Sequence, residues 1–296
     1  MVPGFDWIGS RVYYTPMSIL QIVILAIIQG AAELLPVSSS AHVIVAEKLM
    51  GLEPGSPEMS FLLVMLHTGT MFAVLIYFWS RWKDLIREYK AIIIATICTG
   101  IIGLGLQFVI ERIVLGHQAH AEVEQLFGNL RLIAVALAAV GIIIIAAGMR
   151  ENRGDGNREI SIKSASVIGA VQGVCLPFRG FSRSGATIST GMFQGIARLR
   201  AEEFSFALAI VLTPPVIARE AYRLVKLYPS VHAAREASFH LFGPGLLGMC
   251  FSFAAGLIAL KWLSAWLDQG RWKFFGFYCL FAAVVVFVIY TVLPSA

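Results

Sequence analysis

The chain has 296 residues, of which 58% are hydrophobic and 14% are charged, and its mean hydropathy of +0.78 excludes a soluble globular domain. The formal net charge of +5 would suit nucleic acid. However, the basic residues lie in short loops between apolar runs, so we predict a membrane protein with no nucleic-acid partner. The four cysteines lie in apolar stretches without the spacing of a zinc site or a disulfide framework, and we expect them to be buried hydrophobic side chains.

Apolar runs recur along the whole chain, and each is long enough for a helix to cross a hydrocarbon core of about 30 Å. We therefore predict an all-α, polytopic membrane protein that forms one integral membrane domain over residues 1–296. The six expected spans cover residues 60–80, 91–110, 130–149, 203–221, 242–262 and 274–293.

Two further stretches, 18–49 and 162–200, break at proline, glycine and serine clusters and then resume as short apolar helices. This pattern predicts re-entrant hairpins, because irregular backbone at membrane depth must be buried in protein or line a wet cavity. If each hairpin returns to the side it entered from, the loops of one face carry 13 Lys and Arg and those of the other face carry 6. The positive-inside rule then places both termini outside, with hairpin 18–49 opening outward and hairpin 162–200 opening to the cytoplasm.

The chain also shows a weak internal repeat at an offset of 145 residues. This offset lays Ser39 over Ser184, and it lays Glu58, Ser60, Phe61 and Leu63 over Glu203, Ser205, Phe206 and Leu208. A Gln-Gly pair occurs early in each hairpin, at Gln29-Gly30 and Gln172-Gly173. With hairpins that enter from opposite sides, the pattern predicts an inverted-topology repeat with halves at about 18–149 and 162–293, and a site between them.

The first hairpin gathers polar side chains in an otherwise apolar segment. Gln29 and Glu33 are four residues apart and share one helix face, and Pro36 ends that helix. Serines 38–40 follow as N-caps of the next helix, whose free N–H groups favour an anion, and His42 lies in its first turn. Glu33 and His42 could form a structural pair, but ionisable groups at membrane depth are usually functional, so we interpret this segment as part of an active site.

The second hairpin places Arg183 between Ser182 and Ser184, with Gly180 and Gly185 on either side. A guanidinium binds phosphate through two parallel hydrogen bonds, and hydroxyls with backbone N–H groups can bind the remaining oxygens. The alternative is a charged surface loop, which would not need the flanking glycines. The segment therefore predicts a phosphate-binding site.

These two segments, QGAAELLPVSSSAH and RGFSRSGAT, closely resemble the undecaprenyl-diphosphate phosphatases of the bacitracin-resistance type. The marks of that family are an (E/Q)xxxE motif that runs into PVSS and a histidine, and a later PGxSRSxxT motif. The resemblance extends over nearly the whole chain, including SFLLVMLHTGTMFAVLIYFW and EFSFALAI. It implies a bacterial inner-membrane enzyme, with its active site facing the periplasm or cell exterior, that removes phosphate from a C55 polyprenyl diphosphate and recycles the lipid carrier of cell-wall synthesis.

The resemblance also implies a divalent cation, Mg²⁺ or Ca²⁺, and roles for individual residues. The implied catalytic residues are Glu33, Ser39, His42 and Arg183, and the implied cation ligands are Glu33 and Gln29. The implied substrate-binding residues are Gln29, Ser38, Ser182, Ser184 and Thr187. The nucleophile is either Ser39 or a water polarised by the cation, with a slight preference for Ser39.

Two positions depart from the family pattern. Gln29 is the less acidic option in its motif, which argues against a metal site built from two carboxylates. Arg179 replaces the proline that opens the second motif, with Pro177 two residues earlier. Its side chain either reaches the distal phosphate or extends toward the cytoplasmic interface, and we favour the second interpretation.

Other interpretations stay open at this point. Inverted repeats with broken hairpins are also typical of transporters, so a lipid flippase or small-solute transporter is the alternative function. A phosphatase for another lipid diphosphate would share the chemistry, and a homodimer and a monomer are both compatible with the sequence. His67, inside the first span, is interpreted as a hydrogen-bonded packing residue rather than a ligand.

Overall fold

The structure is a computed structural model that describes residues 17–54, 56–81, 87–114, 126–151, 159–227, 231–267 and 271–292. Residues 1–16 and parts of the loops whose Lys and Arg residues enter the orientation rule lie outside these ranges.

The described residues form helices and connecting turns, without strands, so the predicted all-α class is confirmed. The first half of the chain forms α1 (Ile19–Leu34), α2 (Ser39–Leu49), α3 (Pro57–Tyr77), α5 (Tyr89–Val109) and α6 (Leu130–Glu151). The second half forms α7 (Ile162–Cys175), α8 (Arg183–Phe193), α9 (Arg198–Leu227), α10 (Val231–Leu267) and α11 (Trp272–Val292). Short turns of other helix types, η1 (Trp79–Arg81) and η2 (Ile110–Val114), follow α3 and α5.

Six of these helices are long and apolar enough to cross a membrane, as predicted. The candidate spans are Met59–Tyr77, Tyr89–Ile113, Leu130–Arg150, Arg198–Arg219, Phe242–Leu263 and Trp272–Val292. Each begins and ends within a few residues of the stretch expected from hydropathy alone. The chain is therefore a multi-pass membrane protein.

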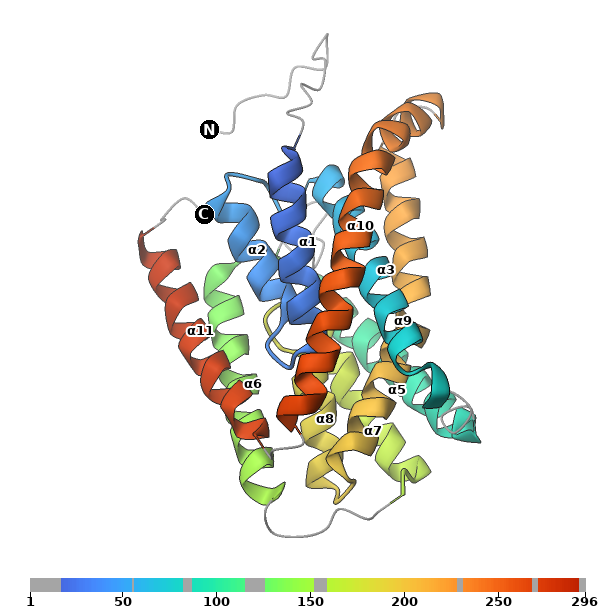
Figure 1. The fold of residues 1–296 in the computed structure, drawn as a ribbon, viewed down its shortest axis with the longest axis vertical. Helices are drawn as coiled ribbons and strands as arrows, with labels where there is room; N and C mark the ends of the chain where they lie inside the picture. Colours follow the sequence, from blue (N-terminus) through green and yellow to red (C-terminus); the bar gives the residue numbers. More distant parts are fainter. Residues whose placement is uncertain are drawn as a thin grey trace.

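The remaining four helices form two hairpins that enter the bundle from opposite ends (Figure 1). We call the end where α1 begins and α11 ends the terminal face, and the other end the opposite face. Helix α1 runs from the terminal face to the middle of the bundle, and α2 returns to the same face. Helix α7 rises from the opposite face to the middle, and α8 returns to that face. This arrangement is compatible with the predicted re-entrant hairpins.

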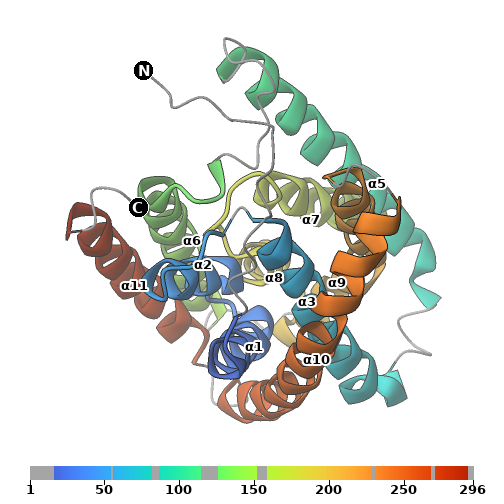
Figure 2. The same cartoon turned by 90° about the horizontal axis from the view of Figure 1, so that it is seen from above.

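The helix order is also compatible with an inverted repeat. An offset near 145 residues lays α1, α2, α3, α5 and α6 over α7, α8, α9, α10 and α11 in turn. Packing follows the same correspondence, because α1 packs against α10 and α7 packs against α5. Figure 2 shows the two hairpins enclosed by the longer helices, with α6 and α11 side by side at one edge.

Close backbone approach holds the hairpins in place. A Cβ at Gly30 of α1 would lie 2.5 Å from the Ser252 carbonyl oxygen of α10, and one at Gly169 of α7 would lie 2.2 Å from the Ala95 carbonyl oxygen of α5. Small residues of this kind are the usual means by which helices pack in a membrane, where no hydrophobic force drives them together. The hairpin tips are consequently fixed in the middle of the bundle.

Candidate active site

The tips of the two hairpins meet at the centre of the molecule. Ser40 Oγ lies 3.5 Å from the backbone nitrogen of Gly180, so the first turn of α2 contacts the turn after α7. Ser38 has a left-handed backbone with φ 67° and ψ 88°, a conformation that costs a residue other than glycine about 1–3 kcal/mol and often occurs at functional sites. Helix α2 begins directly after it.

Both returning helices begin at this junction. The Ser182 hydroxyl caps α8 by accepting a hydrogen bond from the Gly185 backbone N–H at 3.2 Å. Ser38, which we expected to cap α2 through its side chain, makes no such bond, because its backbone is left-handed. Two helix N-termini, with their N–H groups and positive dipole ends, therefore face the space between the hairpins, where they favour an anion.

The Glu33 carboxylate is the centre of the hydrogen-bond network. Arg183 Nη2 donates to its Oε1 at 2.9 Å, which joins the end of α1 to the start of α8. The Ser39 hydroxyl donates to Oε2 at 2.5 Å, and Gln29 Nε2 donates to the same oxygen at 3.1 Å. A serine hydroxyl that already donates to a carboxylate is arranged to lose its proton to that carboxylate.

A cavity of about 420 Å³ adjoins this network, a volume in the range of small-molecule sites. Its polar wall includes Glu33, Ser38, Ser39, Ser40, Ser182, Arg183 and Ser184. Apolar side chains of α3 and α9 form another wall, with Leu63, Val64, Leu212, Val216 and Ile217. The cavity also reaches Glu53 and Phe127, in the segments before α3 and α6. It therefore has a charged floor, formed by the wall with Glu33 and Arg183, and an apolar side.

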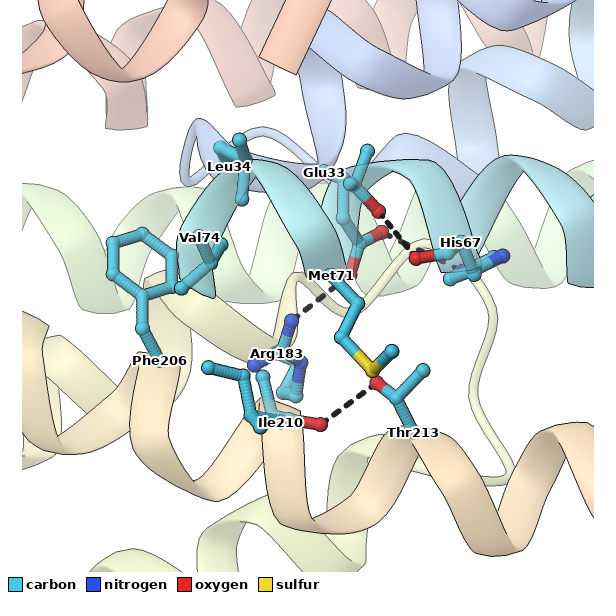
Figure 3. Close-up of a pocket in the computed structure, with 11 residues that line it drawn as sticks. Glu33, Leu34, His67, Met71, Val74, Arg183, Phe206, Ile210 and Thr213 are labelled. Atoms are coloured by element: carbon cyan, nitrogen blue, oxygen red, sulfur yellow. Dashed lines mark hydrogen bonds and ion pairs between the residues drawn. The ribbon is translucent and has the colours of Figure 1, made fainter. Parts of the chain in front are cut away.

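His67 is a member of the site that the sequence interpretation missed. It extends from α3, and its Nε2 lies 3.6 Å from Glu33 Oε2 (Figure 3). Glu33, His67 and Arg183 also line a cleft of about 20 Å³ between α3 and α9, so these three side chains separate the cleft from the large cavity. The available signal was a histidine inside an apolar span, a location that favours function.

Three residues expected at the site lie away from the cavity wall. Gln29 is fully buried behind Glu33. Thr187 is also buried, where its hydroxyl donates to the Arg183 carbonyl at 2.8 Å and lies 2.6 Å from the Ser205 hydroxyl, so it supports the first turn of α8.

The third is His42, which points to α11. Its Nε2 lies 2.7 Å from the Tyr278 hydroxyl, its Nδ1 lies 2.8 Å from the Ser38 carbonyl oxygen, and its ring stacks on Tyr278. Both ring nitrogens are thus engaged away from Glu33. Its catalytic role stays a prediction.

Arg179 lies in the wall of the large cavity. Its guanidinium carbon is 4.2 Å from the centre of the Phe127 ring, a cation–π contact. Phe127 lies in the segment just before α6. The choice between the distal phosphate and the cytoplasmic interface, in which we favoured the interface, stays a prediction.

The donor set fits a divalent cation that is held mainly by the substrate. No group of three His, Cys, Asp or Glu side chains within the described ranges could hold a metal ion. However, the Gln29 Oε1 atom is buried and accepts no hydrogen bond from the described residues, and it belongs to an amide that contacts the Glu33 carboxylate. Mg²⁺ is commonly bound by one or two carboxylates together with substrate phosphates and water, so Glu33 in the cavity wall suits such a cation, whereas the Gln29 amide oxygen lies behind it and away from the cavity.

Fold and site together define a polytopic membrane protein in which a carboxylate contacts a guanidinium and a serine hydroxyl at the junction of two broken hairpins. The family model "Bacitracin resistance protein BacA" matches residues 22–285, and the chain belongs to this family.

The chain is also similar to named members of the family over nearly its whole length. It is 56% identical to "Undecaprenyl-diphosphatase 2" of Acinetobacter baylyi over 283 residues, which cover 91% of this chain and 98% of the relative. It is 33% identical to "Undecaprenyl-diphosphatase" of Thermodesulfovibrio yellowstonii over 273 residues, which cover 90% and 96% of the two chains. The resemblance inferred from the two motifs is confirmed.

Proposed function

We infer that the chain is an integral membrane phosphatase that hydrolyses undecaprenyl diphosphate to undecaprenyl phosphate and inorganic phosphate, and so recycles the lipid carrier for cell-wall synthesis. The observation that carries this conclusion is the contact of one carboxylate, Glu33, with both a guanidinium and a serine hydroxyl at the floor of a cavity with an apolar wall. Family membership and the names of the relatives support the same reaction.

Each polar group has a defined task in phosphoanhydride cleavage. Arg183 and the N-termini of α2 and α8 hold the diphosphate and stabilise the charge that develops on the transferred phosphoryl group. Ser39 Oγ attacks the terminal phosphorus while its proton passes to Glu33 Oε2, and the bond to the bridging oxygen breaks to release undecaprenyl phosphate. Water then hydrolyses the phosphoserine and releases inorganic phosphate. The alternative is direct attack by a water that Glu33 deprotonates.

A divalent cation, Mg²⁺ or Ca²⁺, is part of this proposal. Glu33 would hold it together with oxygens of the diphosphate, and the amide oxygen of Gln29 would join only if the Gln29 side chain turned toward the cavity. When bound, such a cation neutralises phosphate charge and supports departure of the leaving group.

The prenyl chain would lie along the apolar wall of the large cavity. The α3 and α9 side chains in this wall belong to two of the six candidate spans, so the wall continues into the part of the protein that faces lipid. A diphosphate at the polar floor and a polyprenyl tail between α3 and α9 would then fill one continuous space. Diphosphates with other prenyl chains would make the same contacts with the polar floor, and only their contacts with this apolar wall would differ.

The test is release of inorganic phosphate from C55 diphosphate by the purified protein in detergent, with and without a chelator. We expect cation-dependent release and a stoichiometric monophosphate product. Lipid movement across proteoliposomes without phosphate release would support the flippase alternative instead. A comparison of C15 and C55 diphosphates measures how much the apolar wall contributes, because a longer tail should lower KM if it lies there.

We also propose that the enzyme lies in the bacterial inner membrane with the terminal face outside the cytoplasm. This follows from the distribution of Lys and Arg, because the face with 13 basic residues is expected to be cytoplasmic. In a variant without native cysteines, Glu53→Cys at the cavity rim should react with a membrane-impermeant maleimide in intact spheroplasts, whereas Lys163→Cys near the start of α7 should react only after lysis. The reverse labelling pattern would invert the orientation.

A further inference from the structure

His67 faces the Glu33 carboxylate from α3, and Arg183 lies on the other side of that carboxylate (Figure 3). The reaction described above leaves its imidazole unused. His67 nevertheless lines both the large cavity and the cleft between α3 and α9, and it is the titratable side chain that the long span Met59–Tyr77 contributes to the walls of these cavities.

The orientation of the His67 ring is fixed by the backbone one turn earlier. Its Nδ1 lies 2.8 Å from the Leu63 carbonyl oxygen. A carbonyl oxygen can only accept, so Nδ1 carries a hydrogen and donates it. The other ring nitrogen, Nε2, is left to face Glu33. An imidazole tied in this way presents one nitrogen in one direction, as a positioning group requires.

Nε2 is the His67 ring nitrogen that is directed at Oε2 of Glu33. Their separation of 3.6 Å is too long for a direct hydrogen bond. Contacts of this type are often long without substrate and shorten when the reacting complex forms.

The other groups that hold Glu33 come from the two hairpins. Gln29, on α1, and Ser39, on α2, donate to Oε2, and Arg183, at the start of α8, donates to Oε1. His67 adds a contact from a full-length span, which packs against α1 and α9 and makes a fixed support. Glu33 is thereby contacted by both hairpins and by a full-length span.

We propose that His67 is a positioning residue for Glu33: its ring, tied to the Leu63 carbonyl, holds Nε2 beside Oε2 and keeps Oε2 in place against the Ser39 hydroxyl. The inference rests on the proposed phosphatase reaction. It assigns His67 to turnover rather than to substrate affinity, because Arg183 and the helix N-termini bind the diphosphate whether or not Glu33 is well oriented. Misplacement of a catalytic group by about 1 Å can cost about 100-fold in rate.

Two amide substitutions separate this role from packing. His67→Asn keeps an N–H close to Nδ1, so it retains the bond to Leu63 but has no group that reaches Glu33. His67→Gln places its amide nitrogen close to Nε2 and can still donate to Oε2. We expect kcat for C55 diphosphate to fall at least about tenfold in His67→Asn with KM changed less than about twofold, and we expect His67→Gln to recover to within about threefold of the wild type.

Thr68→Val is the matched control for the helix itself. The Thr68 hydroxyl bonds the Val64 carbonyl at 2.8 Å, the same one-turn geometry as His67 Nδ1, but Thr68 lines neither cavity. It should leave kcat unchanged. Affinity for a non-hydrolysable, methylene-bridged prenyl diphosphonate should also be unchanged in both His67 variants.

Several results would overturn the inference. Wild-type kcat in His67→Asn, or equal losses in the Asn and Gln variants, would show that the amide near Nε2 does not matter. A raised KM, weaker binding of the diphosphonate, or a higher cation requirement would assign His67 to ligand binding instead. An inactive wild-type protein would refute the proposed function, a result distinct from all of these.

Discussion

Two clusters of paired charges among the described residues differ in their relation to the cavities. The central cluster of Glu33, His67 and Arg183 lies where the hairpin tips meet and lines both cavities. The opposite-face cluster consists of Arg81, Glu88, Arg200 and Glu203. It joins η1, the start of α5 and the first turns of α9, and none of its members lines either cavity.

The opposite-face cluster is the more heavily paired of the two. Glu203 is buried and forms ion pairs with both Arg81 and Arg200, and Arg200 also pairs with Glu88. Burial raises the pKa of the Glu88 carboxyl, and the Arg200 guanidinium acts in the opposite direction. Every charge there faces another protein charge. The comparison shows that burial and pairing alone do not indicate catalysis; contact with an open cavity and a hydroxyl does.

The sharpest test of the central cluster is Glu33→Gln. We expect phosphate release to fall by at least about 100-fold, because the amide cannot accept the Ser39 proton, as is typical when a general base is lost. The matched control is Glu111→Gln, since Gln107 donates to Glu111 at 2.8 Å with the same four-residue spacing, outside both cavities. Near-normal turnover in Glu33→Gln would remove this carboxylate from the chemistry, and equal loss in both variants would indicate a general defect in folding.

Arg183→Lys tests whether Arg183 binds phosphate through the planar shape of its guanidinium as well as through its charge. A point ammonium cannot reproduce the two parallel hydrogen bonds of a guanidinium, so we expect kcat/KM to fall at least about tenfold although the charge is kept. Steady-state phosphate release at varied substrate measures this value. Unchanged kinetics would mean that Arg183 serves only as the counter-charge of Glu33.

A substitution in the opposite-face cluster should lower the stability of the protein and leave its catalytic activity unchanged. Arg200→Leu removes the partner of Glu88 and one of the two partners of Glu203, which lowers stability by about 1–3 kcal/mol, since a buried acceptor loses its bond. The apparent thermal midpoint in detergent should fall, whereas kcat/KM of the folded fraction should stay within about twofold of the wild type. A stable but inactive Arg200→Leu protein would give this cluster a part in catalysis.

The sequence predicted most of the framework, because the length and polarity of apolar runs directly reflect the thickness of a membrane. The motifs and the hairpin interpretation predicted that Glu33, Ser39 and Arg183 belong to one site, but not that the last two contact Glu33 directly. The roles of the two histidines could not be separated in this way. His42 belongs to the motif yet faces Tyr278, and His67 lies outside it yet faces Glu33, because the facing direction depends on how α2, α3 and α11 pack. Such long-range packing leaves no local pattern in one sequence.

The smallest expected effect concerns Arg179, at the edge of the central site. The turn 178–181 is closed by a bond of 3.1 Å from the Phe181 N–H to the Phe178 carbonyl, and Gly180 has a φ of 94°. A positive φ at the third position is the mark of a type II turn, whose second position favours proline. Arg179→Pro should therefore keep this turn while it removes the guanidinium from the cavity wall.

We expect KM for the diphosphate to rise about threefold in Arg179→Pro, roughly 0.7 kcal/mol, with kcat unchanged. The effect is small because the Arg179 guanidinium already rests on the Phe127 ring, which offsets part of its attraction for an anion. Phe127→Leu is the companion variant, since it removes the ring but keeps the charge, and it should change KM less than Arg179→Pro does. An unchanged KM in Arg179→Pro would restrict substrate binding to Arg183 and the helix N-termini, and a rise of about tenfold would place the distal phosphate directly on Arg179.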